Sequence, residues 1–370
     1  MDLIEQNLLL FTRSMQAGGT EKVVLQLCEI FNGVVKKIVV CSNGGINVEK
    51  LETMSIKHYQ IPDIENKAPS VMIGIAVALK KIIKQENITV IHTHHRMASF
   101  YIAALRLYKK CVFISTSHNV FRNKKWLTYF ACRNGNLIAC GETVKKNLIE
   151  FYGLEEKKVT VIHNAVKPFQ EDIEEDQLIK KLHCKGNYIV GSVGRLSEQK
   201  GMEYFIKAVP SVIKKHGNVR FVIIGSGEEE DKLKTLVEEI GVKPYLHFLG
   251  YRKDVQNLMA QLDLLVLSSL WEGLPLMPIE AYSVRKTVVA TAVDGTLEII
   301  RDGIDGFLVP PRDSEAIANK INYLIDQPSL RCELEKNALE RYQSEFSFER
   351  FSSSYVAYYK TLKVWKAMKN

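Results

Sequence analysis

The stretch YIVGSVGRLSEQKGMEYF, residues 188–205, is the part of the sequence that decides the fold. It opens with an apolar run without polar alternation, as in a strand buried on both faces of a parallel sheet. A glycine-bounded loop with Arg195 and Lys200 follows, and residues 202–217 then place apolar side chains at helical spacing. The stretch therefore predicts a strand, a loop and a helix, with two cations near the positive end of the helix dipole.

The same alternation extends in both directions along the chain. Toward the C-terminus it predicts a helix at 229–241 and strands at 219–227, 245–251, 264–269, 287–291 and 306–310. Toward the N-terminus it predicts helices at 21–32, 70–85 and 142–153, and strands at 7–11, 38–42, 88–94, 112–118, 137–141 and 159–166. The acidic stretch 167–182 has no strong strand pattern and is the candidate linker. We therefore expect two doubly wound α/β domains, 1–168 and 169–350.

The composition is that of a globular protein of enzyme size. Of the 370 residues, 46% are hydrophobic and 25% are charged. The N-terminal segment has two acids before a short apolar run and no basic region, which argues against a signal peptide. No apolar stretch reaches the ~18 residues of a spanning helix, and the seven cysteines show no CxxC spacing. We expect a cytoplasmic protein.

The net charge of +8 is unevenly distributed. Residues 1–168 hold 23 Lys and Arg against 13 Asp and Glu, whereas residues 169–350 hold 23 against 29. A basic half beside an acidic half predicts an anionic surface as partner, with uneven solvation as the alternative. No nucleic-acid-binding motif accompanies the charge, so we expect peripheral attachment to the inner face of a membrane and no nucleic acid. Basic residues lie beside apolar or aromatic ones at Lys80, Lys81 and Lys84, and at Arg122, Lys124 and Lys125 before Trp126, Tyr129 and Phe130.

Glycines mark candidate phosphate-binding loops at two further predicted strands. Gly18 and Gly19 lie shortly after the first strand and just before a helix, and Gly225 and Gly227 end the strand at 219–227. Glycine lets backbone N–H groups approach a phosphate at the start of a helix, although glycine at such turns is common for structural reasons. No GxGxxG follows the first strand, so a nicotinamide dehydrogenase loses its main support.

Two glutamates form a further candidate site in SSLWEGLPLMPIEAYS. Glu272 and Glu280 are separated by seven residues, and Pro275 and Pro278 oppose a helix through the middle. We expect Glu272 on a loop and Glu280 in the first turns of the following helix. A carboxylate can accept hydrogen bonds from both hydroxyls of a ribose.

The order GRLSEQKG, GSG, E-x7-E within EGLPLMPIEA, and DGIDGFLV resembles the retaining GT-B glycosyltransferases of family 4. The resemblance implies two Rossmann-like domains facing across a cleft, with residues 351–370 crossing back as a helix onto the N-terminal domain. It implies that Arg195 and Lys200 hold the donor diphosphate, Glu280 the ribose and Glu272 a hydroxyl of the transferred sugar. It places the base near Tyr251 and Arg252, and the sugar and phosphates near Gly273, Leu274, Pro275, Leu276 and Met277.

In the first domain the resemblance implies a glycine pair and a histidine at the substrates, which Gly18, Gly19 and His118 match. His92, His94 and His95 lie in IHTHHRMA, but no further acid or histidine is placed to complete a metal site. We interpret them as strand-end residues near the acceptor.

The chemistry implied is the departure of a diphosphate whose growing charge Arg195 and Lys200 stabilise. No DxD triplet occurs in the sequence, and the family generally uses fixed cations, so we expect neither a metal nor a cofactor. The family retains anomeric configuration, and we assign no enzymic nucleophile.

We therefore expect a hexosyl- or N-acetylhexosaminyltransferase acting on a glycan or lipid-linked acceptor in polysaccharide synthesis. The donor expected first is a uridine diphosphate sugar, with guanosine diphosphate mannose second. Two alternatives remain: a nucleotide-sugar 2-epimerase on the same scaffold, and a non-catalytic nucleotide-sugar-binding subunit of another transferase.

Overall fold

The computed structural model describes residues 1–169 and 172–362, and it divides the chain into two compact units. The first comprises Met1–Asn164 and the stretch from Phe351, and the second is Ala165–Arg350. The boundary between the two units therefore lies after Asn164, four residues before the expected boundary after residue 168. The reason is that Val166 pairs with Ser347 and its carbonyl accepts a hydrogen bond from Tyr342, both residues of the second unit.

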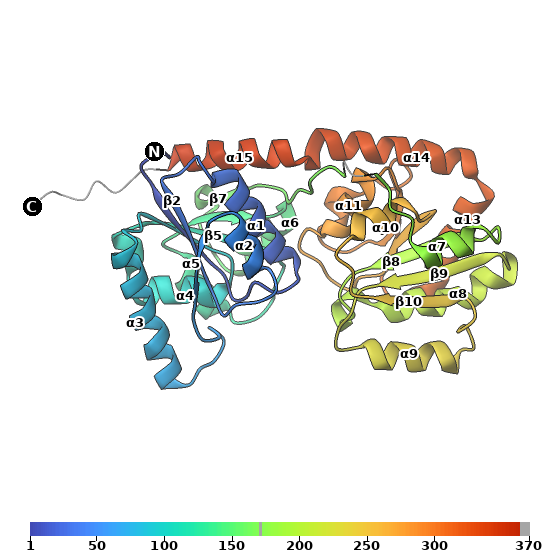
Figure 1. The fold of residues 1–370 in the computed structure, drawn as a ribbon, viewed down its shortest axis with the longest axis horizontal. Helices are drawn as coiled ribbons and strands as arrows, with labels where there is room; N and C mark the ends of the chain where they lie inside the picture. Colours follow the sequence, from blue (N-terminus) through green and yellow to red (C-terminus); the bar gives the residue numbers. More distant parts are fainter. Residues whose placement is uncertain (170–171, 363–370) are drawn as a thin grey trace, which may run out of the picture. The chain divides into compact units, whose positions relative to one another are not determined.

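The first unit is built on a seven-stranded parallel sheet in the order β3-β2-β1-β4-β5-β6-β7 (Figure 1). In this sheet Leu9 of β1 pairs with Val39 of β2 on one side and Ile91 of β4 on the other. The strands are β1 (Asn7–Phe11), β2 (Lys37–Ser42), β3 (Lys57–Gln60), β4 (Val90–Thr93), β5 (Val112–Ser117), β6 (Asn136–Ala139) and β7 (Val159–Val161).

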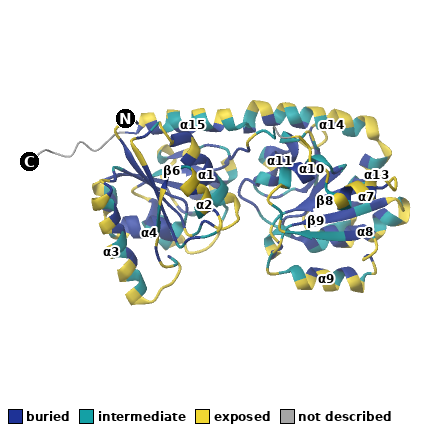
Figure 2. Ribbon diagram, viewed as in Figure 1, coloured by how far each residue is buried: buried dark blue, intermediate teal, exposed yellow. Residues whose placement is uncertain are grey.

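Helices connect these strands and cover the sheet. They are α1 (Gly19–Phe31), α2 (Val48–Thr53), α3 (Pro69–Gln85), α4 (Arg96–Ala104), α5 (Lys125–Cys132) and α6 (Glu142–Lys146), and a π-helical turn at Asn147–Phe151 extends α6. The apolar stripe of α3, with Ile75, Leu79 and Ile82, packs with α4 into one core cluster on the sheet. Figure 2 shows the buried strands beneath helices whose outer faces are exposed.

The C-terminal helix α15 (Phe348–Thr361) completes the first unit. Its Tyr355 and Tyr359 are almost fully buried, and the ring of Tyr359 lies 4.4 Å from that of Phe31 in α1. Packing on the first unit was the expectation for 351–370. Trp365 and Lys366, which contributed to that expectation, lie outside the described residues.

The second unit repeats the pattern with a six-stranded parallel sheet in the order β10-β9-β8-β11-β12-β13. The strands are β8 (Tyr188–Val193), β9 (Val219–Ile224), β10 (Leu246–Gly250), β11 (Leu264–Leu267), β12 (Val288–Thr291) and β13 (Phe307–Val309). The helices are α7 (Gln177–His183), α8 (Met202–Lys215), α9 (Glu230–Glu239), α10 (Val255–Ala260), α11 (Leu276–Ser283), α12 (Thr296–Ile299), α13 (Ser314–Asp326) and α14 (Pro328–Arg341). The second half of the candidate linker is thus helical, because Asp176 caps α7 by accepting hydrogen bonds from Leu178 N and Ile179 N.

Both sheets reverse their winding direction beside their first strand. β1 lies between β2 and β4, and β8 lies between β9 and β11. In such sheets ligands bind beyond the carboxyl ends of the strands at this switch point. The residues that follow β1, β4, β8 and β11 are therefore the ones that the fold itself marks as candidates for a site.

Candidate active site

The loop after β8 is shaped by Gly201, where the chain turns into α8. A 3-10 turn (Glu198–Lys200) precedes this glycine, whose φ of +54° is a left-handed conformation that favours glycine. A side chain at this position would also collide with the carbonyl of Ser268, at the end of β11. The glycine thus allows Lys200 to lie against β11, at the switch point of the second sheet.

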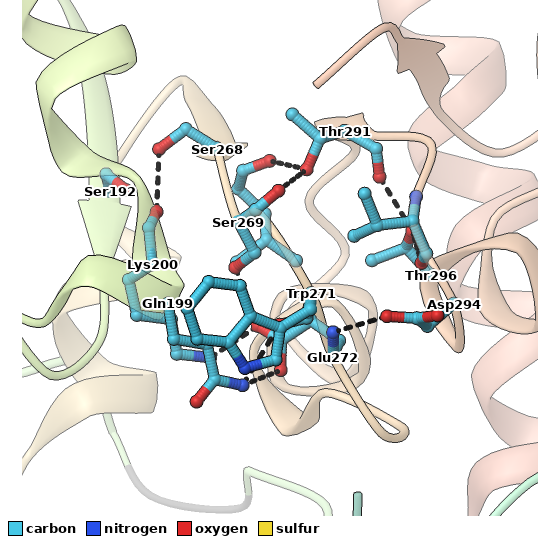
Figure 3. Close-up of polar contacts among 12 residues, drawn as sticks. Ser192, Gln199, Lys200, Ser268, Ser269, Trp271, Glu272, Thr291, Asp294 and Thr296 are labelled. Carbon is cyan, nitrogen blue, oxygen red and sulfur yellow. Dashed lines mark hydrogen bonds and ion pairs between the residues drawn. The ribbon is translucent and has the colours of Figure 1, made fainter. Parts of the chain in front are cut away.

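Lys200 and Glu272 form a buried ion pair there. Lys200 Nζ lies 2.6 Å from Glu272 Oε1, and the two side chains are only 19% and 5% exposed. Figure 3 shows the two residues approaching from the loop after β8 and the loop after β11. The resemblance implied that Lys200 holds the donor diphosphate and Glu272 a hydroxyl of the transferred sugar. The structure brings the two side chains into direct contact with each other.

Three further groups hold Glu272 in place (Figure 3). Ser269 Oγ donates to Oε1 at 2.6 Å, and Gln199 Nε2 donates to Oε2 at 3.3 Å. The backbone N–H of Glu272 donates to Asp294 Oδ2 at 3.0 Å. A buried carboxylate is tolerated only with such compensation, and its orientation is thereby fixed before any ligand arrives.

The loop after β12 packs against the loop that carries Glu272. Thr296 Oγ1 donates to the Thr291 carbonyl at 2.6 Å, and Thr291 Oγ1 donates to the Ser269 carbonyl at 2.6 Å. A side chain at Gly295 would collide with the carbonyl of Gly273, so the two loops pack backbone to backbone. The result is a rigid support for the residues around Glu272.

The ammonium of Lys200 retains binding capacity in this state. An ammonium carries three N–H donors, and Glu272 is its only hydrogen-bond partner among the residues that the structure describes. Two donors can therefore serve an anion without breaking the ion pair. A positive group at a switch point, held by a fixed carboxylate, is suited to bind the phosphates of a nucleotide.

Arg195 occupies a different environment from Lys200. Its side chain is 71% exposed and pairs with Glu228, with Nη2 3.0 Å from Oε2. The resemblance implied that Arg195 and Lys200 hold one diphosphate, but in the structure the two side chains pair with different carboxylates. Exposure leaves Arg195 free to exchange Glu228 for an anion at little cost, since exposed ion pairs contribute about 0–1 kcal/mol.

Gly225 and Gly227 are needed for the protein's own backbone. A side chain at Gly225 would collide with the carbonyl of Gly194, and one at Gly227 with the carbonyl of Leu196. Leu196 N also donates to the Ser226 carbonyl at 3.0 Å. The close approach that the sequence suggested for a ligand is thus made by the loop after β8, and the glycines position that loop.

Glu280 lies in α11, and Glu272 on the preceding loop, as expected from the two prolines. Pro275 is the residue before the helix and Pro278 lies in its first turn, where proline is tolerated. Glu280 is 9% exposed, and Leu274 and Met277 are also buried. Gly273 to Met277 therefore form a short segment between the two carboxylates, with Pro275 and Leu276 at the start of α11.

Tyr251 and Arg252 follow β10. Tyr251 is 49% exposed, as a base-stacking residue would be. Arg252 pairs with Asp254 and, at 2.8 Å, with Asp176, and these hydrogen bonds raise the pKa of its guanidinium. Arg252 thus ties the start of α7 to the loop after β10.

The DGIDGFLV motif contributes to the scaffold. Asp305 is fully buried and accepts hydrogen bonds from the hydroxyl of Tyr282 at 2.8 Å and from Arg301 Nε at 2.6 Å. Asp302 Oδ1 accepts from Leu308 N at 2.9 Å. The motif therefore fixes the turn before β13 against α11, which carries Glu280.

In the first unit the glycine pair lies at the start of α1, as expected. Gly18 is the residue before the helix and Gly19 its first residue. The carboxylate of Glu21 accepts from Ser14 Oγ at 2.7 Å and lies so close to Gly18 that a side chain there would displace it. An acid thus occupies the helix start at which the sequence placed a phosphate.

A histidine cluster lies at the switch point of the first sheet. His94 Nδ1 is 3.0 Å from His118 Nε2, and the ring of His92 lies 4.2 Å from that of His94. Burial lowers the pKa of His118 to about 4 and that of His94 well below its usual range. Burial also lowers the pKa of His95, to about 4. The rings of His94, His95 and His118 are therefore neutral at pH 7.

These histidines are not arranged as a metal centre. Within residues 1–169 and 172–362, no group of three or more His, Cys, Asp or Glu side chains is placed to hold a metal ion. Both nitrogens of His92 are engaged, by Tyr359 Oη at 2.7 Å and Thr116 Oγ1 at 2.6 Å.

Sequence reasoning missed Gln199, Ser269, Asp294 and the pairing of His94 with His118. Gln199 and Ser269 are direct neighbours of residues in recognised motifs, but no local pattern distinguishes a supporting polar residue from a solvated one. Asp294 lies 22 positions from the residue whose N–H it accepts, so only the fold reveals its role.

The fold and these loops define a protein of two doubly wound units, one with a buried lysine–glutamate pair and one with a buried histidine pair at the switch point. The profile of the glycosyl transferases group 1 matches residues 174–341, and that of glycosyltransferase family 4 matches residues 17–168. The chain belongs to the group 1 glycosyltransferases and has the GT-B fold. The expected family and fold class are thereby confirmed.

Similarity to relatives extends over most of the chain. An uncharacterized glycosyltransferase of Methanocaldococcus jannaschii is 26% identical over 86% of this chain and 85% of its own. The Escherichia coli UDP-Gal:alpha-D-GlcNAc-diphosphoundecaprenol alpha-1,3-galactosyltransferase is 27% identical over 89% of this chain and 90% of its own. The crystal structure of Anabaena HepE in complex with UDP-glucose superposes with a TM-score of 0.85, at 21% identity, covering 97% of this chain and 100% of HepE.

Proposed function

We propose that this glycosyltransferase moves a sugar, with retention of anomeric configuration, from a uridine diphosphate sugar to a glycan or lipid-linked saccharide in the synthesis of a cell-surface polysaccharide. The observation that carries the proposal is the Lys200–Glu272 pair at the switch point, which offers two ammonium N–H groups beside a fixed carboxylate. The name of the Escherichia coli relative, and the UDP-glucose in the HepE crystal, support the choice of donor and acceptor.

In this proposal Lys200 binds the diphosphate and Glu272 accepts a hydrogen bond from a hydroxyl of the transferred sugar. Arg195 exchanges Glu228 for a phosphate oxygen, Glu280 accepts from the ribose, and Tyr251 stacks on the base. Backbone groups between Gly273 and Met277 meet the sugar and phosphates. Each role uses the charge and position that the residue already has in the second unit.

The reaction then needs little from side chains. The bond from the anomeric carbon to the phosphate oxygen breaks, and the negative charge that develops on the diphosphate is stabilised by Lys200 and Arg195. The acceptor hydroxyl attacks from the same face, and its proton passes to the departing phosphate. We propose that two fixed cations replace a divalent metal here. The transferred group is a hexosyl or N-acetylhexosaminyl residue.

A membrane-facing surface on the first unit is a further part of the proposal. α3 exposes Ile73 two turns before Lys80 and Val77 one turn before it. α5 exposes Trp126, of which 83% is accessible, directly after Lys124 and Lys125. Tyr129 and Phe130 are partly buried, and Arg133 lies over both rings, so Trp126 is the exposed aromatic of this helix. Basic groups beside exposed apolar side chains suit an interfacial site on anionic lipid.

Among the described residues, no helix has both the length and the apolar character needed to cross a membrane. We propose peripheral attachment through the first unit on the cytoplasmic leaflet, where a polyprenyl-linked acceptor is presented.

The test is release of nucleoside diphosphate from UDP-glucose, UDP-galactose and UDP-N-acetylglucosamine, with GDP-mannose as a fourth donor, each with and without a polyprenyl-diphosphate-linked saccharide. We expect UDP release that depends on the acceptor, with a product of the donor's anomeric configuration. Formation of an epimer without acceptor would support the 2-epimerase alternative. Donor binding without any release would support the non-catalytic subunit.

A further inference from the structure

Asp294 lies in a tight turn whose backbone favours glycine. Thr296 N donates to the Val293 carbonyl at 2.9 Å and closes a β-turn, of which Asp294 is the first central residue. The φ of Asp294 is +36°, whereas Gly295, the second central residue, has φ −69° and ψ −9°. A positive φ at the first central residue alone is the pattern of a type II′ turn, in which glycine is preferred at that position. The chain therefore carries a side chain where its backbone favours none.

This positive φ is not the ordinary one at the end of a helix. Four other residues with positive φ come directly after the C-cap of a helix, where a left-handed residue is common. They are Ser55, Asn87, Arg106 and Arg285. Asp294 instead lies between β12 and α12, at the carboxyl edge of the sheet where ligands bind. A strained backbone that persists at such a place points to a side chain with a role in function.

The Asp294 carboxylate has a single partner. Its Oδ2 accepts from the backbone N–H of Glu272 at 3.0 Å, and within the described part of the chain no other hydrogen bond or ion pair engages it. Figure 3 shows the carboxylate pointing toward Glu272 from the loop after β12. A carboxylate that accepts from a backbone N–H forms a charge-assisted hydrogen bond, about twice as strong as a neutral one. The side chain that strains the turn is therefore used on Glu272.

The loop that carries Glu272 is held from two directions. On one side Gln199 holds the two residues before it. Leu270 N donates to the Gln199 carbonyl at 2.8 Å, and Gln199 Nε2 donates to the Trp271 carbonyl at 3.0 Å. On the other side Asp294 holds the next backbone group, the N–H of Glu272 itself. Loss of the Asp294 carboxylate would free the peptide group of Glu272 at the point from which its side chain starts.

We propose that Asp294 is a positioning residue, which accepts the backbone N–H of Glu272 and so orients the Glu272 carboxylate toward a hydroxyl of the transferred sugar. The strained turn is retained because glycine, which would relieve it, has no oxygen to accept this N–H. The hydrogen bond and the strain belong to this chain alone, whereas the contact of Glu272 with the sugar rests on the proposed function. Asp294 itself touches neither substrate. Replacement by glycine should therefore separate stability from transfer.

The first experiment measures thermal unfolding of the full-length wild type and of three variants. Asp294→Gly should melt at or above the wild-type temperature, because relief of the positive φ offsets the lost hydrogen bond. Asp294→Ala loses the hydrogen bond and keeps the strain, so it should melt at a lower temperature. Asp294→Asn keeps an acceptor oxygen and tolerates positive φ, so it should resemble the wild type. An Asp294→Gly variant that melts as low as Asp294→Ala would overturn the proposal.

Hydrogen exchange of the Glu272 amide, followed by NMR in the same proteins, tests the contact itself. We expect this amide to exchange at least about tenfold faster in Asp294→Gly and Asp294→Ala than in the wild type, because it loses its acceptor. Asp294→Asn should retain most of the protection. A Glu272 amide with wild-type exchange in Asp294→Gly would also overturn the proposal.

The last experiment measures transfer from a UDP-sugar to acceptor, together with the dissociation constant of UDP. We expect kcat/KM for the UDP-sugar to fall at least about tenfold in Asp294→Gly and to be recovered to within about threefold in Asp294→Asn, whose amide oxygen still accepts the N–H. UDP carries no sugar, so its affinity should stay within about threefold of the wild type in both variants. A wild-type kcat/KM in Asp294→Gly would contradict the positioning role.

Asp313→Ala is the matched control. Asp313 Oδ1 accepts from the backbone N–H of Ala316 at 2.8 Å at the start of α13, and its φ is −117°. Its loss should lower the melting temperature and leave transfer unchanged, the reverse of the result expected for Asp294→Gly. Absence of transfer by the wild type from every UDP-sugar would contradict the proposed function instead. The melting temperatures and the exchange of the Glu272 amide would then still decide whether Asp294 holds Glu272.

Discussion

Replacement of Glu272 by glutamine should strengthen the binding of UDP while it weakens transfer. Lys200 Nζ and Glu272 Oε1 are 2.6 Å apart, and the side chains are 19% and 5% exposed. At that distance and an effective dielectric constant of about 20, the gross Coulomb attraction is about 6 kcal/mol, much of which offsets the desolvation of the two groups. In the empty site this attraction competes with a diphosphate for the charge of Lys200.

Glutamine keeps the shape and one oxygen that can accept from Ser269 Oγ, but it removes the competing charge. Its NH2 group cannot accept the 3.3 Å hydrogen bond from Gln199 Nε2. A hydrogen bond between charged groups contributes about 1.5–3 kcal/mol, and each 1.4 kcal/mol corresponds to a tenfold change in affinity. We therefore expect UDP to bind Glu272→Gln at least about tenfold more tightly than the wild type. The unliganded variant should lose a similar free energy of unfolding, because Lys200 is left without its counter-charge. Transfer should fall because the amide oxygen of glutamine is a weaker hydrogen-bond acceptor for the sugar hydroxyl than the charged carboxylate of Glu272.

Isothermal titration with UDP and thermal unfolding without ligand measure the two effects. Glu228→Gln is the matched control, since Glu228 pairs with Arg195 in an exposed position and its loss should change UDP affinity by less than about fivefold. A folded Glu272→Gln variant that binds UDP as weakly as the wild type, or more weakly, would refute the competition between carboxylate and diphosphate.

Three further predictions concern the support of the site, its titration and its surface. Gly201→Ala should lower the free energy of unfolding by more than about 1 kcal/mol, since φ is +54° and the added methyl group meets the Ser268 carbonyl. Gly217→Ala is the control, because its added methyl group faces open space and should leave urea unfolding nearly unchanged. Burial lowers the pKa of His95 to about 4, so the unfolded chain binds more protons than the folded one between pH 6.5 and 4. The free energy of unfolding therefore falls as the pH drops through that window. His95→Asn keeps the cap on α4 and should reduce the loss of stability between pH 7 and pH 5 by about 2 kcal/mol. An unchanged pH slope would contradict the assignment of a neutral His95. Sedimentation with vesicles should show binding to anionic lipid that is lost at high salt and weakened by Trp126→Ala; equal binding to neutral vesicles, or none to either, would remove the membrane surface.

The sequence predicted the sheets well because buried parallel strands are continuous apolar runs. Five of the strands that it predicted in the first unit have both ends within two residues of the observed ends, as for β1. In the second unit the same holds for the strands predicted at 245–251, 264–269, 287–291 and 306–310, whereas the strand predicted at 219–227 runs three residues past the end of β9. β3 was missed because KHYQ at the edge of its sheet is polar and at most half-buried. Residues 177–182 of α7 were assigned to a linker because their acidic surroundings concealed a short helix capped by Asp176.

The sequence predicted which residues belong to the site but not the contacts that these residues make. Lys200, Glu272 and His118 could be selected because they lie at the ends of predicted strands or in the loops after them, and Glu280 because it completes the E-x7-E spacing in EGLPLMPIEA. Their partners could not, because Ser269, Gln199 and Asp294 approach through the crossing of loops from β8, β11 and β12, which no local periodicity encodes. Gly225 illustrates the same limit, since a glycine that clears a backbone carbonyl has the same local signature as one that clears a phosphate.

The most direct test of the central claim, that Lys200 holds the diphosphate of the donor, is the dissociation constant of UDP for Lys200→Ala measured by isothermal titration beside the wild type. Loss of one hydrogen bond between charged groups predicts binding weaker by about 10- to 150-fold, or about 1.5–3 kcal/mol. Circular dichroism would establish that the variant is folded. A folded Lys200→Ala variant that binds UDP with wild-type affinity would contradict the claim.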